Sequence, residues 1–586
     1  MEKISFLLKY IRAHTLSYAL GVFFIVVTNW VAVIIPEYIQ KSMDLLSDQL
    51  AQNEELLAEY IMTIMGLAIS MIVIRTLSRI FFFTPGRAIE CEIKNDMFAK
   101  LMELQKDYHD KNPSGTVISK LNNDVNGIRL LCGFAMMQAF NIISALSLTP
   151  FMMWKLSPRL TLYCVIPIIL VFTIVRIGMR YLVKNMRERM VALQDLSGFT
   201  VSALSGIDVI KSFGMARWVE NEFDKENKEM LKRSLNISWV RSFLISVLNN
   251  MENILKTLIL LVGGIFVIEE QFTIGELTAF ITYAGLLTMP LMGLGWVSTM
   301  LQQGMVGLES VQTIMKEESH FHKIPSLPAK ESHSLFGTGL EIRNLNYHYP
   351  GQDQATLHSI DFHILPGQTI GILGRIGSGK TTLVNCLNRY LTVGDQQVWI
   401  GGQDINTLSN SDLRGSIRTV TQDPFLFSDT VDNNITFGKQ EHEDDNESAN
   451  LEQLLFECAL SEEVQRFPLQ EKTLVGEKGI MLSGGQKQRI SLARAMIAHC
   501  DLLILDNVLS AVDAETESFL LQQILRKQHA QSLLIVSHRA KSMEKADWIL
   551  ILEDGKIVDQ GTHSELLGRP GYYQKTWMLQ NEMTTS

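Results

Sequence analysis

The sequence predicts a chain of two parts: an all-α membrane domain of six spanning helices with long cytosolic helical extensions, and an α/β P-loop NTPase domain. Two observations predict this fold class. Before about residue 305 the chain has six long apolar stretches, and about 20 apolar residues cross a bilayer. After about residue 338 the composition is that of an ordinary α/β protein, and this part contains a glycine-rich phosphate-binding motif.

The composition agrees with a membrane part joined to a soluble part. Of the 586 residues, 47% are hydrophobic and 19% are charged, against about 25% charged residues in soluble proteins. The six cysteines lack the spacing of a metal site or a disulfide framework, which excludes a small disulfide scaffold. A net charge of −10 argues against a nucleic-acid partner.

The first apolar stretch, LSYALGVFFIVVTNWVAVII, carries no charge and is long enough to span a bilayer. It is too long for a signal peptide and lacks a small-residue cleavage site, so we expect it to be retained. A buried globular helix is the alternative for any single stretch, but six such stretches favour membrane spans. The spans are expected near residues 16–36, 58–83, 131–153, 159–179, 242–268 and 277–300.

The charges of the connecting segments predict the orientation. Lys3, Lys9 and Arg12 precede the first span, whereas the next connection, SDQLAQNEELLAE, has no Lys or Arg. The connections at 84–129 and 180–239 are rich in Lys and Arg, and the last one, EEQFTIGE, has none. The positive-inside rule then places both termini in the cytosol, in a multi-pass protein of the cytoplasmic membrane.

The two basic connections are long for loops, so we expect the second to fifth spans to continue as helices into the cytosol. A segment rich in Ser, Pro and charged residues follows the sixth span and marks the domain boundary. The expected division is a membrane domain at 1–305, a linker at 306–337, a nucleotide-binding domain at 338–580 and a tail at 581–586.

The segment TIGILGRIGSGKTT at 369–382 contains the pattern G-x-x-x-x-G-K-T between a β-rich run and a helical pattern. Such glycines let backbone N–H groups surround phosphate oxygens at the positive end of a helix. Lys380 is expected to reach the β- and γ-phosphates, and the Thr381 hydroxyl to bind Mg²⁺. A chance glycine-rich turn is the alternative, which the flanking patterns disfavour. The expected phosphate-binding residues are Gly374, Arg375, Ile376, Gly377, Ser378, Gly379, Lys380, Thr381 and Thr382.

Three further motifs accompany the phosphate loop. DLLILD is a continuous apolar run typical of a buried parallel strand, and Asp506 at its end is expected to bind Mg²⁺ through water. In LSGGQKQR, Ser483 and the glycine N–H groups could bind an anion, or Ser483 could cap a helix. His538 ends the run SLLIVSH and could polarise a γ-phosphate or simply end a strand.

The ordered set of Tyr349 in NYHYPG, GRIGSGKT, Gln422 in VTQDPFLF, LSGGQ, LLILD, SAVD and His538 resembles the ATP-binding cassette of ABC transporters. Six spans before one cassette are similar to an ABC exporter half-transporter, and the resemblance covers nearly the whole chain. The segments YHDKNPSGTVISKLNNDV and SALSGIDVIKSFG resemble the two cytosolic loops whose coupling helices dock on the cassettes.

The resemblance implies roles for these residues and two cofactors, ATP and Mg²⁺. Tyr349 would stack on adenine, Gln422 would sense Mg²⁺ and the membrane domain, and His538 would contact the γ-phosphate. The signature would cover the ATP bound to the other subunit, so one chain does not form a complete site and needs a second half-transporter. The signature residues are Leu482, Ser483, Gly484, Gly485 and Gln486.

The sequence departs from the family at position 507. In the family a Glu follows the strand-ending Asp and polarises the attacking water, whereas this chain has Asn507. A neutral amide orients a water molecule but does not accept its proton, and loss of a general base costs about 10²–10⁴-fold in rate. We expect nucleotide binding to persist and hydrolysis at this site to be slow. Turnover supported by a neighbour such as His538 is the alternative.

The replacement resembles one subunit of bacterial heterodimeric multidrug exporters, which keeps LSGGQ but lacks the Glu. Its partner has the Glu and an altered signature. The resemblance implies that Asn507 lies in a degenerate ATP site, that this chain's LSGGQ serves the partner's competent site, and that the pair exports hydrophobic or amphipathic small molecules. A homodimer with two slow sites, a lipid flippase half-transporter and a regulatory, non-pumping ATP sensor are the alternatives.

The fifth expected span carries polar residues well inside the membrane, in SVLNNMENILKTLILL. Glu252 and Lys256 are four residues apart with Glu first, the favourable order for an ion pair on one helix face. Ionisable groups buried in membranes usually face a cavity. We therefore expect Asn249, Glu252, Asn253 and Lys256 to line the translocation path; a structural pair against another helix is the alternative.

Overall fold

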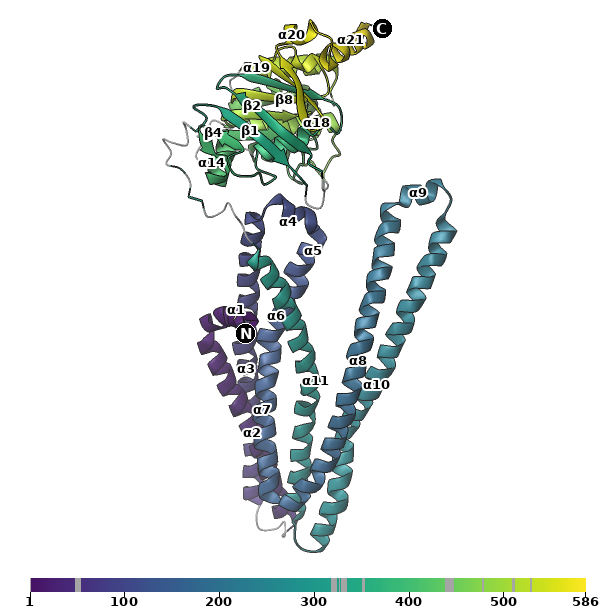
Figure 1. Cartoon of the computed structure of the whole chain (residues 1–586). Helices are drawn as coiled ribbons and strands as arrows, with labels where there is room; N and C mark the ends of the chain where they lie inside the picture. The colour runs from purple at the N-terminus through teal and green to yellow at the C-terminus, as the bar shows by residue number, and fades with distance from the viewer. Residues whose placement is uncertain are drawn as a thin grey trace. The chain divides into compact units, whose positions relative to one another are not determined.

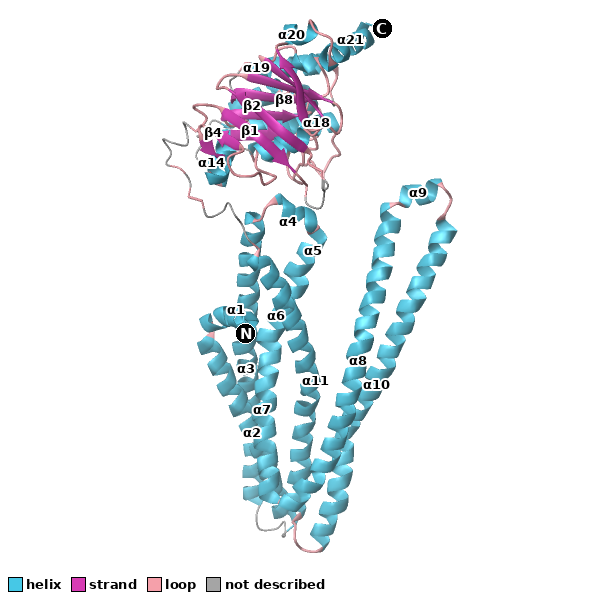
Figure 2. Ribbon diagram, viewed as in Figure 1, coloured by secondary structure: helices cyan, strands magenta, loops and turns pink. Residues whose placement is uncertain are grey.

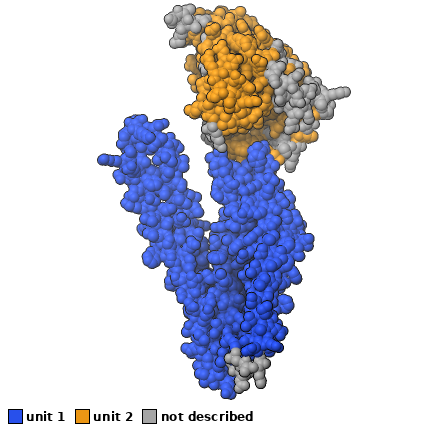
Figure 3. Space-filling view, turned by 180° about the vertical axis from the view of Figure 1, so that it is seen from behind, with its two compact units in different colours: residues 1–102, 113–317 blue, residues 103–112, 318–586 orange. Residues whose placement is uncertain are grey.

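The computed structural model describes residues 2–47, 54–317, 324–325, 327, 335–349, 354–437, 447–476, 479–508, 512–526 and 530–585. They belong to two compact units, which Figure 3 shows in different colours. The first unit comprises residues 1–102 and 113–317, and the second comprises residues 103–112 and 318–586. Residues 318–323, 326 and 328–334 of the expected linker, and Ser510 and Ala511 of the SAVD motif, lie outside the described residues.

The described part of the first unit is helical throughout (Figures 1 and 2). Six of its helical segments are long and apolar enough to cross a membrane, as the sequence predicts. Most extend far beyond the length of a membrane span, so the expected helical extensions are present. The elements are α1 (Glu2–Ala13), α2 (Thr15–Ser47), α3 (Glu54–Glu103), α5 (Ser114–Ser119), α6 (Val125–Leu130), α7 (Met136–Leu156), α8 (Pro158–Ser205), α9 (Ile207–Ser212), α10 (Ala216–Ile268) and α11 (Ile274–Lys316).

The third membrane-length segment runs without interruption from Ser114 to Leu156. Two π-helical turns, η2 (Lys120–Asp124) and η3 (Leu131–Ala135), are inserted between its α-helical parts. Both turns pack against α11. Single π turns of this kind accommodate an extra residue within a continuous helix.

Helices α8 and α10 form a long antiparallel hairpin closed by α9, and in Figure 1 this hairpin diverges from α6, α7 and α11 toward α9. Arg233 of α10 forms an ion pair with Glu188 of α8. Large apolar side chains are exposed along the part of the hairpin that leads to α9. Phe213, directly after α9, is 77% exposed, and Trp239 of α10 is 76% exposed. This part of the hairpin thus leaves apolar surface uncovered within the chain.

The core of the first unit lies where the hairpin meets the other helices. Leu160 of α8, Leu255 and Ile259 of α10, and Phe280 of α11 are all fully buried in one apolar cluster. Burying such a side chain contributes roughly 1.5–3 kcal/mol. The hairpin is therefore anchored to the rest of the unit at one end.

Close helix packing explains why α11 continues into the segment expected to be a linker. Residues 306–316 form the last turns of α11 rather than irregular chain. A Cβ atom at Gly307 would come within 3.0 Å of the Asp124 carbonyl, and one at Gly304 would come within 3.0 Å of Leu131. Leu308 and Val311 are fully buried. These contacts hold the helix in place past the membrane-length segment.

The second unit is an α/β domain, as predicted, and its described residues form two sheets (Figure 2). The four-stranded sheet has the order β2-β1-β4-β5 and is antiparallel. The six-stranded sheet has the order β10-β9-β3-β8-β7-β6. The strands are β1 (Leu340–Tyr347), β2 (Leu357–Ile364), β3 (Thr369–Gly374), β4 (Val398–Ile400), β5 (Gln403–Asp404), β6 (Ile417–Val420), β7 (Cys500–Asp506), β8 (Ala530–Ser537), β9 (Trp548–Glu553) and β10 (Lys556–Gly561).

Apolar clusters cover both faces of the six-stranded sheet. One cluster joins it to the four-stranded sheet and to α13, and the other joins it to α16, α18, α19 and α21. Burial on both faces explains the continuous apolar runs of its parallel strands. The helices of the unit are α4 (Lys106–Lys111), α13 (Lys380–Leu387), α14 (Asn410–Ser416), α15 (Val431–Thr436), α16 (Glu447–Glu457), α17 (Ser461–Gln465), α18 (Gly484–Met496), α19 (Ala514–Leu525), α20 (His563–Leu567) and α21 (Tyr572–Thr585), with 3₁₀ turns η4 (Ile405–Thr407), η5 (Gln470–Lys472) and η6 (Lys541–Met543).

The short helix α4 belongs to the second unit although it follows α3 in the chain. The side chain of Gln105, just before α4, accepts a hydrogen bond from Thr392 Oγ1 at 3.1 Å. This is the segment expected to carry the first coupling helix.

Replacement of Gly307 by Ala should destabilise the protein by about 1–3 kcal/mol, because the new Cβ would press on the Asp124 main chain. Gly295→Ala is the matched control in the same helix, because nothing lies within 4 Å of a Cβ there. Thermal unfolding of the detergent-solubilised chain measures both. Equal melting temperatures for the two variants would contradict the packing described.

Candidate functional site

The polar ends of four neighbouring strands meet at one edge of the six-stranded sheet. Strands β3, β8, β7 and β6 are adjacent and parallel, so their carboxyl ends point the same way. The phosphate loop follows β3, His538 follows β8, Asp506 ends β7, and Gln422 follows β6. Ligands of open α/β sheets bind at such an edge. The topology thus brings together four groups that are far apart in the sequence.

The phosphate loop has the backbone that its glycines permit. Gly377 and Gly379 have positive φ angles of 85° and 97°, which side chains disfavour. Lys380 begins α13, and its Nζ donates hydrogen bonds to the carbonyls of Gly374 at 2.8 Å and Arg375 at 2.7 Å. The buried Ser378 hydroxyl has no hydrogen-bond partner among the described residues. A free hydroxyl donor in a loop of this shape suits a phosphate oxygen.

Asp506 lies close to the start of α13. It is 3% exposed, and burial raises the pKa of its carboxyl, while a hydrogen bond with Thr381 and the charge of Lys380 oppose that shift. Burial likewise lowers the pKa of the Lys380 ammonium, against the charge of Asp506. The opposite charges and the Thr381 hydroxyl form a compact polar group beneath the phosphate loop.

The donor set fits Mg²⁺ carried by a nucleotide. Among the described residues there is no group of three or more His, Cys, Asp and Glu side chains able to hold a metal alone. Mg²⁺ typically takes one or two protein oxygens and completes its shell with phosphates and water. Thr381 and Asp506 are already in hydrogen-bond contact and match that pattern. The Gln422 side chain is exposed at the same edge.

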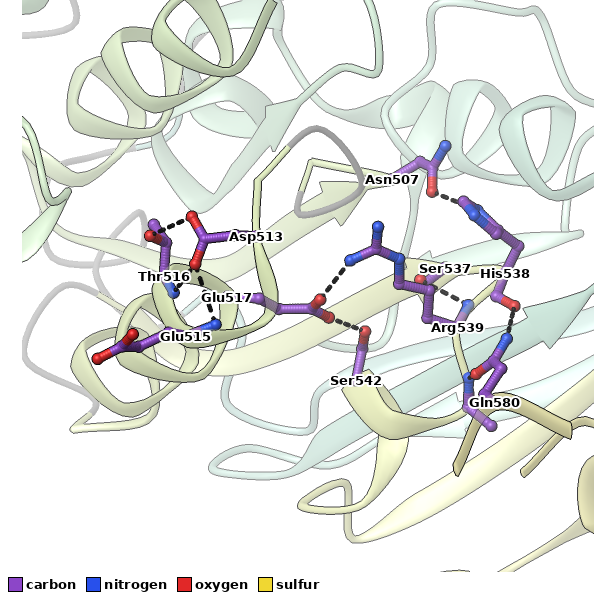
Figure 4. A network of polar contacts seen from close by, with 11 residues as sticks. Asn507, Asp513, Glu515, Thr516, Glu517, Ser537, His538, Arg539, Ser542 and Gln580 are labelled. Carbon is purple, nitrogen blue, oxygen red and sulfur yellow. Dashed lines mark hydrogen bonds and ion pairs between the residues drawn. The ribbon is translucent and has the colours of Figure 1, made fainter. Parts of the chain in front are cut away.

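Asn507 and His538 face each other across this edge (Figure 4). His538 Nδ1 lies 2.9 Å from Asn507 Oδ1. Asn507 has a φ of 54°, a left-handed conformation that Asn tolerates better than most residues, and its N–H donates to the Val536 carbonyl at 2.8 Å. Burial lowers the pKa of the His538 imidazole, and the charges of Arg539 and Lys380 lower it further.

A second group of polar residues surrounds the loop that carries His538, and the sequence analysis did not identify it. Arg539 Nη1 donates to Glu517 Oε2 of α19 at 2.6 Å, and Ser542 also binds Glu517 (Figure 4). Gln580 of α21 binds the main chain of His538 and Ala540. These contacts join side chains to a loop and leave no periodic pattern in the sequence.

Tyr349 stands near the phosphate loop. Its hydroxyl is 3.1 Å from Thr382 Oγ1, and its ring meets Tyr347 edge to face with centroids 5.2 Å apart. The ring is only partly buried.

The LSGGQ signature begins helix α18. Ser483 is the N-cap: its hydroxyl accepts from the Gln486 N–H at 3.2 Å, while the Gln486 side chain accepts from the Ser483 N–H at 2.9 Å. Leu482 is buried, whereas Ser483 and Gly484 are exposed. The capping hydrogen bonds and the buried Leu482 therefore fix the start of α18, while Ser483 and Gly484 remain accessible to a ligand. The helix also contacts the Gln422 segment, since Gln488 Nε2 donates to the Gln422 carbonyl at 3.0 Å.

The polar residues of α10 fall into two groups. Lys256 Nζ and Glu252 Oε1 are 2.7 Å apart, and the two side chains are 42% and 40% exposed. A Cβ at Gly285 of α11 would lie 3.7 Å from that carboxylate oxygen. Asn253 instead lines a cavity of about 440 Å³ that the ion pair does not line, and Asn249 is exposed. The cavity is lined by Asn250, Asn253, Ile254, Thr257, Leu258, Leu261 and Val262.

Comparison with known proteins identifies both units. Residues 18–291 match the family described as ABC transporter transmembrane region, and residues 357–510 match the family described as ABC transporter. A probable multidrug resistance ABC transporter ATP-binding/permease protein of Bacillus subtilis is 27% identical over 584 residues, covering 98% of this chain and 97% of the relative. An ATP-dependent lipid A-core flippase of Aromatoleum aromaticum is 31% identical over 501 residues, covering 83% and 80%.

The fold also matches a solved structure. A bacterial Atm1-family ABC exporter with ATP bound superposes with a TM-score of 0.81 over 96% of this chain and 99% of that chain, at 23% identity. Six membrane-length helices thus precede one ATP-binding cassette in a single polypeptide. The chain therefore belongs to the ABC transporter family, as an exporter-type half-transporter with a fused membrane domain and ABC-type ATPase cassette.

Proposed function

We propose that this chain is the degenerate-site half of a heterodimeric exporter that moves hydrophobic or amphipathic compounds out across the cytoplasmic membrane. The observation that carries the proposal is Asn507, which directly follows the last residue of β7, where the family has a catalytic Glu. The multidrug name of the Bacillus subtilis relative, which matches almost end to end, supports the substrate class. Both termini, by the positive-inside rule, would lie in the cytosol.

ATP would lie along the edge where the parallel strands end. Tyr349 would stack on adenine, and the backbone of residues 374–382 would bind the phosphates. Lys380 would exchange its two carbonyl hydrogen bonds for β- and γ-phosphate oxygens. Bound Mg²⁺ would neutralise phosphate charge, with Thr381, Gln422 and a water on Asp506 holding it.

The amide of Asn507 would hold this ATP rather than hydrolyse it. It has no basic group to accept a proton from water, and its Oδ1 is already engaged by His538. His538 would stay bound to Asn507 through Nδ1. Hydrolysis would then occur mainly at the second site, where the partner supplies the carboxylate.

The second site would need the signature of this chain. Ser483 and the adjacent N–H groups form an intact, capped helix start that faces outward, and an anion is stabilised at such a position. The exposed apolar residues of the α8–α10 hairpin, Phe213 and Trp239 among them, also favour association with a second half-transporter. A partner carrying Glu and an altered signature would complete both sites.

Lipid export is the second candidate function. The lipid A-core flippase of Aromatoleum aromaticum shares higher identity with this chain than the multidrug relative does, although over a shorter part of it. The same membrane domain would carry either substrate class, a lipid with a charged head group or a hydrophobic drug. Transport of labelled lipid, measured beside transport of drugs, separates the two.

Asn507→Glu should raise the ATPase rate of the chain by about 10²-fold or more when it is assembled with a partner whose own catalytic Glu is replaced by Gln, because the new carboxylate accepts the proton from water. Asn507→Gln is the matched control, since Gln has the length of Glu without its charge. Phosphate release from the detergent-solubilised pair measures both. A wild-type chain that alone hydrolyses ATP and pumps substrate like an exporter with intact Glu would contradict the heterodimer.

We also propose that the Glu252–Lys256 pair lines the translocation path. Both side chains are partly exposed within the chain, and the Glu252 carboxylate lies beside Gly285 of α11, a residue without a side chain. Holding an ion pair in the membrane is costly, which favours a role for it. Asn249 would share this side of α10, whereas Asn253 would contribute through the neighbouring cavity.

Lys256→Ala should lower drug transport and drug-stimulated ATPase of the reconstituted transporter about tenfold, through loss of one charge-assisted contact. Lys228→Ala is the matched control, because Lys228 forms an i,i+4 pair with Asp224 on the same helix outside the expected span. The double variant Glu252→Gln/Lys256→Met removes both charges together. Normal transport by that double variant would show that the pair is only structural.

A further inference from the structure

The C-terminal helix α21 holds the loop that presents His538. Gln580 Oε1 accepts a hydrogen bond from the Ala540 N–H at 2.8 Å, and Gln580 Nε2 donates to the His538 carbonyl at 3.2 Å (Figure 4). Both groups belong to the main chain on either side of Arg539. One side-chain amide therefore closes a ring of hydrogen bonds across the loop and fixes its backbone.

Helix α21 is firmly attached at this point. Tyr573 is 1% exposed and lies in the same apolar cluster as Ala540 and Met543. Its hydroxyl is 2.6 Å from His563 Nδ1, and its ring stacks with Trp577. Gln580 thus extends from a helix that is anchored to the core beside the loop.

The opposite side of the loop is held by α19. Glu517, 6% exposed, binds both Arg539 and Ser542, and Ser537 Oγ accepts from the Arg539 N–H at 3.0 Å. The His538 side chain itself has one described polar contact, Nδ1 to Asn507. With Nδ1 engaged, Nε2 is the ring nitrogen that would reach a γ-phosphate. Its direction depends on the backbone of residue 538.

We propose that Gln580 is a positioning residue for His538, through which the C-terminal helix sets how tightly this site holds ATP relative to ADP. The inference rests on the proposed contact between His538 and the γ-phosphate. ADP lacks that phosphate, so a loop released from Gln580 loses affinity for ATP and keeps its affinity for ADP. A purely structural role would weaken both nucleotides together.

The test uses the full-length chain assembled with its partner half-transporter and photoreactive azido analogues of ATP and ADP. Labelling on ice suppresses turnover, and electrophoresis separates this chain from its partner. Gln580→Ala should raise the ATP-analogue concentration for half-maximal labelling about fivefold, the effect of losing one to two hydrogen bonds. The concentration for the ADP analogue should not change.

Gln574→Ala is the matched control. Gln574 lies on the same helix, and its Nε2 donates to the Leu567 carbonyl at 3.0 Å instead of to the loop. It should leave both nucleotides unaffected. The double variant Gln580→Ala/His538→Ala should bind ATP no more weakly than His538→Ala alone, because both changes act through one group.

Two results would overturn the inference, and they differ in cause. If Gln580→Ala weakens ATP and ADP equally, or adds fully to His538→Ala, Gln580 supports the cassette in general. If His538→Ala itself fails to separate ATP from ADP, the proposed role of His538 is wrong and the positioning role falls with it. A thermal unfolding curve for each variant identifies any that do not fold.

Discussion

The parallel alignment of β3, β8, β7 and β6 is the constraint on which the nucleotide chemistry depends. Parallel neighbours deliver their carboxyl ends to one edge, and the register pairs Leu373 with Ser537 and Asp506 with Val536. That register determines where Lys380, Asp506 and His538 lie at the edge of the sheet. A shift of one residue would turn each strand over and move these groups away from the edge. The apolar clusters on both faces of the sheet oppose such a shift.

Much of this arrangement could be predicted from the sequence, because motifs that end apolar runs mark strand ends. Asp506 ends one buried strand and His538 follows another, and glycines of the phosphate loop identify positions of positive φ. The helix start at Ser483 was likewise visible as a capping pattern. In each of these cases the local sequence contains the physical cause.

Other features have causes that lie elsewhere in the chain. Gln580 binds the main chain of a loop and Glu517 binds side chains of the same loop, and such bonds leave no spacing that could be recognised. The end of α11 was expected to belong to the linker because the apolar stretches end before about residue 305; contact with the main chain at Asp124 keeps it helical. The polar residues of α10 looked like one cluster in the sequence, but Asn253 borders a cavity that Glu252 and Lys256 do not reach.

Replacing a carboxylate at position 507 also changes the electrostatics of the edge. Asp506 is already buried, with a raised pKa that reflects the cost of its charge. A Glu next to it would add a like charge, which raises that cost further and repels the phosphates. The neutral amide of Asn507 adds no repulsion with Asp506 or the phosphates, and it still binds His538. Under the proposed function, the same substitution would slow hydrolysis and favour retention of ATP, and a site that retains ATP would benefit most from a histidine held in one direction.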